Sequence, residues 1–303
     1  MEIRSGALPV LFVHSGKQWY LKKTIQMAEA YNDTVILLGD ESNRLFCKNW
    51  IAQDSLPQKR FLEFQKIYRH MSSNSYQFEL SCFKRFYLIY EFLIQHDMPA
   101  CVMLDSDLCS FVKYSDLDFM KQGFDAAYSI PETQEPLVWT GSPHMSFWTI
   151  KGLGAFLDFI ERSYEGDMPE LEEKFEYHRN NQKDGGICDM TLLYLWGKKE
   201  EVKIYNTALK TKSGVFDHSL SVCSNYKKEE YQFDTKFGIK HIEWENGIPY
   251  FVDAETGEKV KALTIHAQGS SKPYIWAISK RKNWKLFRVF CNIYIWMRKM
   301  IKR

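Results

Sequence analysis

A strand–helix–strand pattern opens the chain and restricts the kind of sheet that it can build. Residues 8–14 (LPVLFVH) are an apolar run ending at a Ser-Gly pair, which predicts a buried strand followed by a turn. Residues 19–31 carry apolar side chains at helical spacing, and residues 34–38 (TVILL) form a second apolar run. Two strands joined by a helix predict a parallel sheet with helices on its faces. Ligands of such sheets bind beyond the carboxyl ends of the strands.

The later sequence continues this alternation and then changes. An aromatic-rich helical stretch at 79–96 runs into a short apolar strand at 100–104. From about residue 239, an Asn-Gly turn between short apolar runs predicts a hairpin. The length of 303 residues therefore fits one large α/β domain with a mixed, mostly parallel sheet flanked by helices. The remaining expectations are strands at 124–130, 146–150 and 260–265, helices at 153–164 and 189–196, and a polar surface excursion at 165–184.

The charge of the chain is unevenly distributed. The formal net charge is +2, but no Asp or Glu follows Glu258, and nine Lys or Arg lie in the last 24 residues. Without those nine, 31 basic residues remain against 38 acidic ones, so the body carries a formal charge of −7. Cationic tails of this kind usually meet anionic surfaces, either phospholipid headgroups or nucleic acid.

Cysteine content and hydropathy indicate the compartment. The seven cysteines form no Cys-x-x-Cys pair, and several lie within apolar runs, which favours free thiols in a reducing compartment over disulfides or a zinc site. The N-terminal sequence lacks the long apolar stretch of a signal peptide. The sequence contains no run of about 18 apolar residues, so it predicts no membrane-spanning helix.

Two aspartates follow the strand at 100–104. Asp105 and Asp107 are separated by one residue, and in extended chain such residues point the same way. Their carboxylates can therefore converge on one hard cation, which prefers oxygen ligands. A cation there can stabilise a departing diphosphate. The alternative is a strand that simply ends in an acidic turn.

A second polar motif, IHAQGSSKPY, follows the apolar strand at 260–265. The imidazole of His266 can complete a site for Mn²⁺ or a similar ion that already has two carboxylates. Gly269 allows the backbone to approach a phosphate, and Lys272 places a point charge for a phosphate oxygen. Taken alone, this motif would fit a surface histidine beside a Gly-Ser loop.

With both motifs, the sequence resembles GT-A glycosyltransferases, which have a Rossmann-like fold. It looks most like the retaining family with DxD and HxxGxxKP motifs, which includes bacterial lipo-oligosaccharide galactosyltransferases and glycogenins. The resemblance implies that Asp105, Asp107 and His266 hold Mn²⁺ or Mg²⁺, and that Lys272 and the Gly269 backbone meet the diphosphate of a UDP-sugar donor. It also implies that Arg85, in the helix before DxD, contacts the donor.

The chain departs from this family at two places. Asp189 resembles the first residue of the family's acidic DQD turn, but Met190 stands where the family has glutamine. His144-Met145-Ser146-Phe147 replaces the family's acceptor-side FNAG-like strand. These departures leave open whether the reaction retains or inverts the sugar configuration, and they leave the acceptor unassigned.

Further candidate residues follow from position. His14 and Ser15 end the first strand, where a nucleoside would lie in this fold, although a capped strand end is the alternative. Ser106, between the two aspartates, is also expected at the donor. Asp184 and Asp189 are best placed to face the acceptor, and in an inverting enzyme one of them would be the general base.

The last segment predicts a membrane contact. We expect residues 1–276 to form the catalytic domain and residues 277–303 a basic amphipathic tail that is too short to span a bilayer. Trp284, Tyr294 and Trp296 would sit at headgroup level with Lys and Arg on anionic lipid. The alternatives are a helix packed on the body, and nucleic-acid binding, against which the acidic body argues.

These observations favour one function over three others. The expected enzyme is a hexosyltransferase that moves a sugar from UDP to a saccharide hydroxyl, on an acceptor of the lipopolysaccharide, capsule or other lipid-linked type. It would be cytoplasmic and peripherally attached to the inner face of the membrane. The alternatives are an inverting transferase on the same scaffold, a metal-dependent nucleotidyltransferase, and a non-catalytic sugar-binding module. No Walker motif or Gly-x-Gly-x-x-Gly supports the nucleotidyltransferase.

Overall fold

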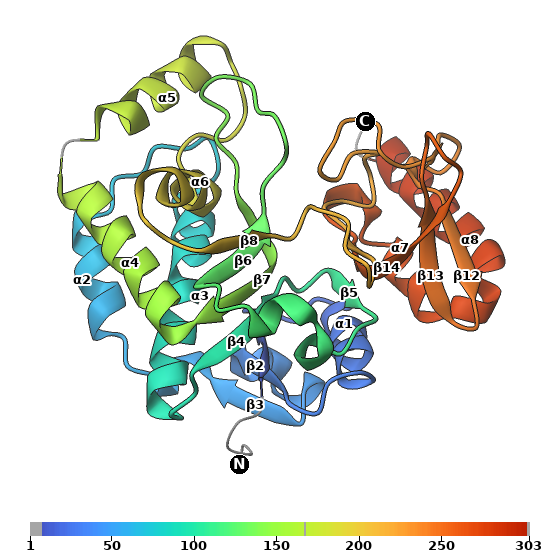
Figure 1. Ribbon diagram of the computed structural model, residues 1–303, viewed down its shortest axis with the longest axis horizontal. Helices are drawn as coiled ribbons and strands as arrows, with labels where there is room; N and C mark the ends of the chain where they lie inside the picture. Colours follow the sequence, from blue (N-terminus) through green and yellow to red (C-terminus); the bar gives the residue numbers. More distant parts are fainter. Residues whose placement is uncertain (1–7, 167, 302–303) are drawn as a thin grey trace.

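A twisted central sheet organises the larger part of the molecule (Figure 1). The computed structural model describes residues 8–166 and 168–301. The seven strands of the sheet lie in the order β3-β2-β1-β4-β7-β6-β8. They are β1 (Val10–Val13), β2 (Val35–Gly39), β3 (Asn49–Ala52), β4 (Ala100–Leu104), β6 (Ala126–Ser129), β7 (Ser142–Thr149) and β8 (Ile204–Asn206).

Most neighbouring strands of this sheet are parallel. β1 pairs in parallel with β2 and β4, β2 with β3, and β6 with β8. β7 runs antiparallel to both of its neighbours, and it places Met145 opposite Leu104 at the carboxyl end of β4. The predicted mixed, mostly parallel sheet is therefore confirmed, and the start of β7 lies at the edge where ligands of such sheets bind.

Helices cover both faces of the sheet, as the alternation of side chains along β1 requires. Leu11 packs toward the face covered by α2 (Lys59–Ile67), α3 (Tyr76–Gln95), α4 (Ile150–Glu165) and α6 (Asp189–Lys199). Phe12 packs toward the opposite face, which α1 (Leu21–Glu29) covers. Both faces are dry, which explains why the strands are continuous apolar runs rather than alternating ones.

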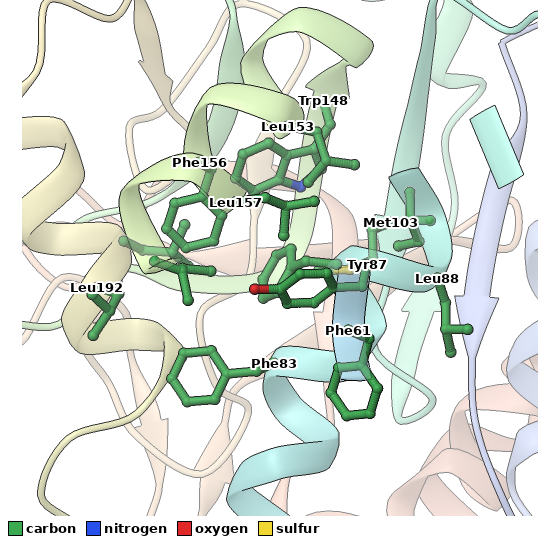
Figure 2. Close-up of a cluster of buried hydrophobic side chains, with 14 of the residues drawn as sticks. Phe61, Phe83, Tyr87, Leu88, Met103, Trp148, Leu153, Phe156, Leu157 and Leu192 are labelled. Atoms are coloured by element: carbon green, nitrogen blue, oxygen red, sulfur yellow. The ribbon is translucent and has the colours of Figure 1, made fainter. Parts of the chain in front are cut away.

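The core on the α3 side is rich in aromatic side chains (Figure 2). Trp148 of β7 is fully buried, stacks on Phe156 of α4 with ring centroids 5.5 Å apart, and meets Phe86 of α3 edge to face. Side-chain caps start the two helices that carry this core: Ser75 accepts from Phe78 N, and Thr149 accepts from Gly152 N. Burial of these large rings fixes α3 against the sheet, and α3 carries Arg85 toward the end of β4.

A second sheet forms beside the first, on the right of Figure 1. The predicted hairpin is β12 (Ile242–Glu245) and β13 (Ile248–Val252), and Asn246 and Gly247 between them both have positive φ, as its turn requires. β14 (Lys259–His266) pairs with β13, with β9 (Val215–Phe216) and with β5 (Leu108–Ser110), which directly follows the two aspartates. A two-stranded ladder, β10 (Phe233–Asp234) and β11 (Ile239–Lys240), lies in the same part of the chain.

Two segments differ from the sequence-based expectation. The irregular stretch between the second strand and α3 contains β3 and α2, whose short, partly polar sequences resemble loop. The segment expected as a polar excursion contains α5 (Pro169–Asn180). Proline at its first position, acidic residues in its first turn and basic residues in its last turn stabilise this helix despite its low hydrophobicity.

The C-terminal helices pack on the second sheet. α7 (Tyr274–Ser279) and α8 (Trp284–Ile301) bury Ala277, Ile278 and Cys291 in its core. Trp284 is 3% exposed and lies near Tyr274 and Trp244, so the prediction that it sits at headgroup level is wrong. Among the described residues, no helix is long and apolar enough to cross a bilayer. The basic residues Lys302 and Arg303 lie outside the described residues.

Candidate active site

Two sheets bring the predicted metal ligands together. Asp105 and Asp107 follow β4, and His266 ends β14, where it pairs in register with Leu108 of β5. One ligand atom from each of the three residues lies within 4.8 Å of the others. The turn between β4 and β5 is fixed by three backbone bonds: Asp105 N to His144 O, Leu108 N to Asp105 O, and Ala267 N to Asp107 O.

Asp107 is the electrostatic centre of this cluster. Its two carboxylate oxygens lie 3.4 Å from His266 Nε2 and 3.0 Å from Lys272 Nζ. Burial alone would raise the pKa of Asp107, but the two cationic partners outweigh it and lower the pKa to about 2. Burial likewise lowers the pKa of His266 and Lys272, and Asp107 raises both above their ordinary values. The aspartate therefore stays ionised at neutral pH.

The imidazole of His266 has a defined orientation. Its Nδ1 lies 2.7 Å from the His218 carbonyl oxygen, which can only accept, so Nδ1 carries the proton. Nε2 faces Asp107, which favours a proton there, and loss of that proton leaves the neutral tautomer whose Nε2 lone pair is directed at the cluster. Two carboxylates and one imidazole nitrogen are a donor set that suits Mn²⁺ or Mg²⁺, and the fixed tautomer is the one that a metal-binding histidine needs.

The loop after β14 brings the ammonium group of Lys272 next to this cluster. Gly269 has φ +57°, a left-handed conformation that favours glycine, and it begins the short turn Gly269–Ser271. Lys272 follows this turn, and its side chain remains one-third exposed. The Lys272 ammonium therefore borders both Asp107 and solvent, as a group that meets an incoming anion requires.

Arg85 joins two carboxylates from different elements. Its Nη1 lies 2.6 Å from Asp105 Oδ1, and its Nη2 pairs with Asp189 Oδ2 at the start of α6. Asp189 is nearly fully buried, and its other oxygen accepts from Met190 N at 2.9 Å. Burial raises the pKa of Asp189 above its ordinary value, although Arg85 partly offsets the shift.

The other predicted residues are spread around this centre. His14 and Ser15 lie at the carboxyl end of β1, where Gly16 N donates to Asp40 Oδ2 at 2.6 Å. Ser106 is half-buried, and its carbonyl accepts from Thr24 Oγ1. Asp184 is exposed in the loop before α6, and within the described chain no hydrogen bond or ion pair connects its side chain to the metal-ligand cluster.

Three polar residues that the sequence did not assign to the site surround His266. His144 of β7 stacks on the His266 ring with centroids 4.5 Å apart and an interplanar angle of 2°. Asp217 accepts from His266 N, and Lys240 pairs with Asp217 at 2.5 Å, both of them fully buried. No local motif identifies this group, because the three residues come from distant segments of the chain. The sequence signals were His144, just before the predicted strand at 146–150, and the adjacent Asp217 and His218.

The fold resembles that of several solved glycosyltransferases. Mouse xyloside xylosyltransferase 1 in its apo form superposes with a TM-score of 0.45 at 12% identity, over 67% of this chain and 85% of that one. The galactosyltransferase LgtC with donor and acceptor sugar analogues gives 0.39 and 14%, over 66% and 73%. A glycosyltransferase involved in glycosylation of the major capsid of PBCV-1 gives 0.39 and 11%, over 96% and 99%. No family model and no curated protein matches the sequence.

Proposed function

We propose that this protein is a metal-dependent glycosyltransferase that uses a UDP-hexose as its nucleotide-sugar donor and a saccharide as its acceptor. The observation that carries the proposal is the convergence of Asp105, Asp107 and His266, with their ligand atoms within 4.8 Å, under the ammonium of Lys272. A divalent cation held by these three side chains would neutralise the diphosphate leaving group. Carboxylates at the end of a sheet strand and a lysine open to solvent together favour a diphosphate substrate over a purely structural ion site.

The remaining side chains have roles that follow from their contacts. Lys272 can exchange its contact with Asp107 for a phosphate oxygen, because the ammonium is already at the surface of the cluster. Arg85 holds the Asp105 carboxylate toward the cluster through Nη1, and its Nη2 pairs with Asp189. It would therefore fix the orientation of Asp105 and lie next to the donor sugar. His14 and Ser15, which directly follow β1, would contact the nucleoside.

We further propose that the reaction retains the configuration of the sugar. Both oxygens of Asp189 are engaged, by Arg85 and by Met190 N, so this carboxylate positions Arg85 rather than acting as a general base. Asp184 is exposed and not connected to the cluster by any described contact. Because neither of these two candidate carboxylates is arranged to take the acceptor's proton, the departing phosphate oxygen of the donor would serve as the base on the same face of the sugar.

The test is release of UDP from a panel of UDP-sugars, with and without Mn²⁺, by the wild type, Asp107→Asn and Asp116→Asn. Asp116 is an exposed carboxylate outside the site and serves as the matched control. We expect Mn²⁺-dependent release from one donor by the wild type and Asp116→Asn, and loss of release in Asp107→Asn. Equal release by Asp107→Asn, or no binding of UDP with Mn²⁺ in calorimetry, contradicts the proposal.

We also propose that α8 docks on an anionic membrane surface, on the cytoplasmic face, where a lipid-linked acceptor would lie. Trp296 is 62% exposed, and it belongs to an apolar stripe along the outer side of α8 that also comprises Leu286, Val289, Phe290, Ile293, Tyr294, Met297 and Met300. Lys285 and Arg298 are exposed on the same helix, and no acidic residue follows Glu258. An apolar face flanked by cations fits an anionic lipid surface, which offers both a hydrocarbon layer and negatively charged headgroups.

Surface substitutions test this docking better than truncation, since removal of the tail would also remove Trp284 and Cys291 from the core. We expect Leu286→Ser with Trp296→Ser to abolish sedimentation with vesicles of phosphatidylglycerol and phosphatidylcholine. The control Leu45→Ser, at an even more exposed apolar site far from α8 in the sequence, should leave sedimentation unchanged. Unchanged sedimentation of the α8 variant would refute the membrane contact. The membrane contact would also be refuted if the wild type does not sediment with vesicles and light scattering shows that it self-associates through α8.

A further inference from the structure

A buried lysine ties together the loop on which His266 depends. Lys240 Nζ donates to Asp217 Oδ1 at 2.5 Å, to the Ser219 carbonyl at 2.8 Å and to the Ser224 carbonyl at 3.1 Å. These three bonds use all three N–H groups of an ammonium. Because Lys240 is fully buried, each bond replaces one that water would otherwise supply, and the 217–224 loop cannot shift without leaving a donor unpaired.

The same loop makes both fixed contacts of His266. Asp217 Oδ2 accepts from His266 N at 3.0 Å, and the carbonyl of the next residue, His218, accepts from His266 Nδ1 at 2.7 Å. The first contact fixes the backbone at the end of β14, and the second fixes the tautomer and tilt of the ring. The position of His266 Nε2 therefore depends on where the 217–224 loop lies.

His144 contacts both the 217–224 loop and the His266 ring. His144 Nε2 donates to the Asp217 carbonyl at 2.9 Å, and its ring lies flat against the ring of His266. The backbone of His144 also accepts from Asp105 N at 2.8 Å, so the same residue contacts the DxD turn. His144 thus spans the two halves of the metal-ligand cluster.

We propose that Lys240 and Asp217 are positioning residues that hold His266 in the Nδ1–H tautomer with Nε2 directed at the cation site. The His144 ring, which stacks on the His266 ring, supports this orientation. This inference deepens the proposed function, since it rests on the same metal site. An ion pair is suited to this place because its net charge is zero. The lysine supplies three donors for the loop, while Asp217 prevents its charge from opposing a bound cation.

The decisive variant is the double substitution Asp217→Asn with Lys240→Met. It keeps the net charge of the pair at zero and an acceptor oxygen for His266 N, and it removes the bonds to Ser219 and Ser224. The matched control is Lys174→Met, which removes another buried ammonium, bonded to the Val138 carbonyl and outside the contacts of His266. A second double variant, Asp217→Asn with Lys240→Gln, retains one amide donor toward the loop.

Two measurements are made on the full chain: Mn²⁺ affinity by calorimetry, and the imidazole nitrogen shifts of His266 by NMR in chelator. We expect the Met double variant to lose Mn²⁺ affinity by about 10- to 100-fold, the Gln double variant to lose less, and Lys174→Met to keep it. In chelator, at a pH high enough for the His266 ring to be neutral, the ring should change from one tautomer to a mixture in the Met double variant only.

Each outcome separates this inference from the proposed function. If the wild type binds Mn²⁺ and the Met double variant binds it equally well while folded, the positioning role is refuted and the proposed function stands. If the wild type does not bind Mn²⁺, the proposed function fails. The tautomer measurement then decides the positioning role alone, and an unchanged His266 spectrum in the Met double variant refutes it.

Discussion

Replacing Asp107 with asparagine removes the charge around which the candidate site is organised. The partners of Asp107 lower its pKa from an ordinary 3.8 to about 2. At 1.36 kcal/mol per pKa unit, the ionised carboxylate contributes about 2 kcal/mol to the free energy of unfolding. Because the folded-state pKa is depressed, this stability is fully present above pH 3.8 and is lost as the pH falls toward 2. Asparagine has the shape of the protonated acid and lacks the charge, so it should lose this contribution.

Urea unfolding in chelator-containing buffer measures this contribution without any metal. We expect Asp107→Asn to be about 2 kcal/mol less stable than the wild type at neutral pH, with the difference shrinking in acid below the ordinary pKa. Asp116→Asn, at an exposed site, should match the wild type throughout. If Asp107→Asn is as stable as the wild type at neutral pH, then Lys272 and His266 do not stabilise the aspartate, and the electrostatic description of the site is wrong.

Three further substitutions test other parts of the structure by the same unfolding assay. Arg85→Met leaves the buried Asp189 without its cation and should cost about 3–5 kcal/mol; because the pKa of Asp189 is already raised, the loss should be smaller in mild acid, and a pH-independent loss would contradict the pairing. Trp148→Ala empties the aromatic core between α3 and α4 and should also cost about 3–5 kcal/mol, whereas a loss typical of a surface site would contradict the packing. Gly186→Ala places a Cβ 2.3 Å from the Met71 carbonyl oxygen at φ +144° and should cost about 1–3 kcal/mol; unchanged stability would show that this loop can move.

The elements that sequence predicted well are those with a strong apolar period. The strand at 100–104 was located at its observed bounds, and the Asn246-Gly247 turn has the positive φ angles that its residues favour. β3 was missed because its pairing with β2, rather than an apolar pattern of its own, holds it in place. α5 was missed because its proline and its terminal charges, rather than an apolar period, stabilise it. Trp284 was misplaced for a related reason: an amphipathic helix has one buried side, and sequence alone does not say whether lipid or protein covers it.

The residues of the candidate site also divide into those that the sequence predicted and those that it did not. Asp105, Asp107, His266 and Lys272 were identified because each follows an apolar strand, so position in the fold and chemistry coincide in the sequence. His144, Asp217 and Lys240 were not, since a buried polar group is recognised by its partners, and those partners are distant along the chain. Their burial without water is what makes these contacts obligatory.

The pairing of β14 with β5 also sets the order in which the protein can mature during synthesis. A nascent chain that has emerged only as far as the hairpin already carries both aspartates, but β5 still lacks the antiparallel partner that covers its edge. An uncovered strand edge leaves backbone N–H and C=O groups unpaired, and those of β5 find their partners only when β14 has emerged. His266 and Lys272 arrive with the same late segment that closes the edge. The candidate cation site is therefore completed in the same step that covers this strand edge.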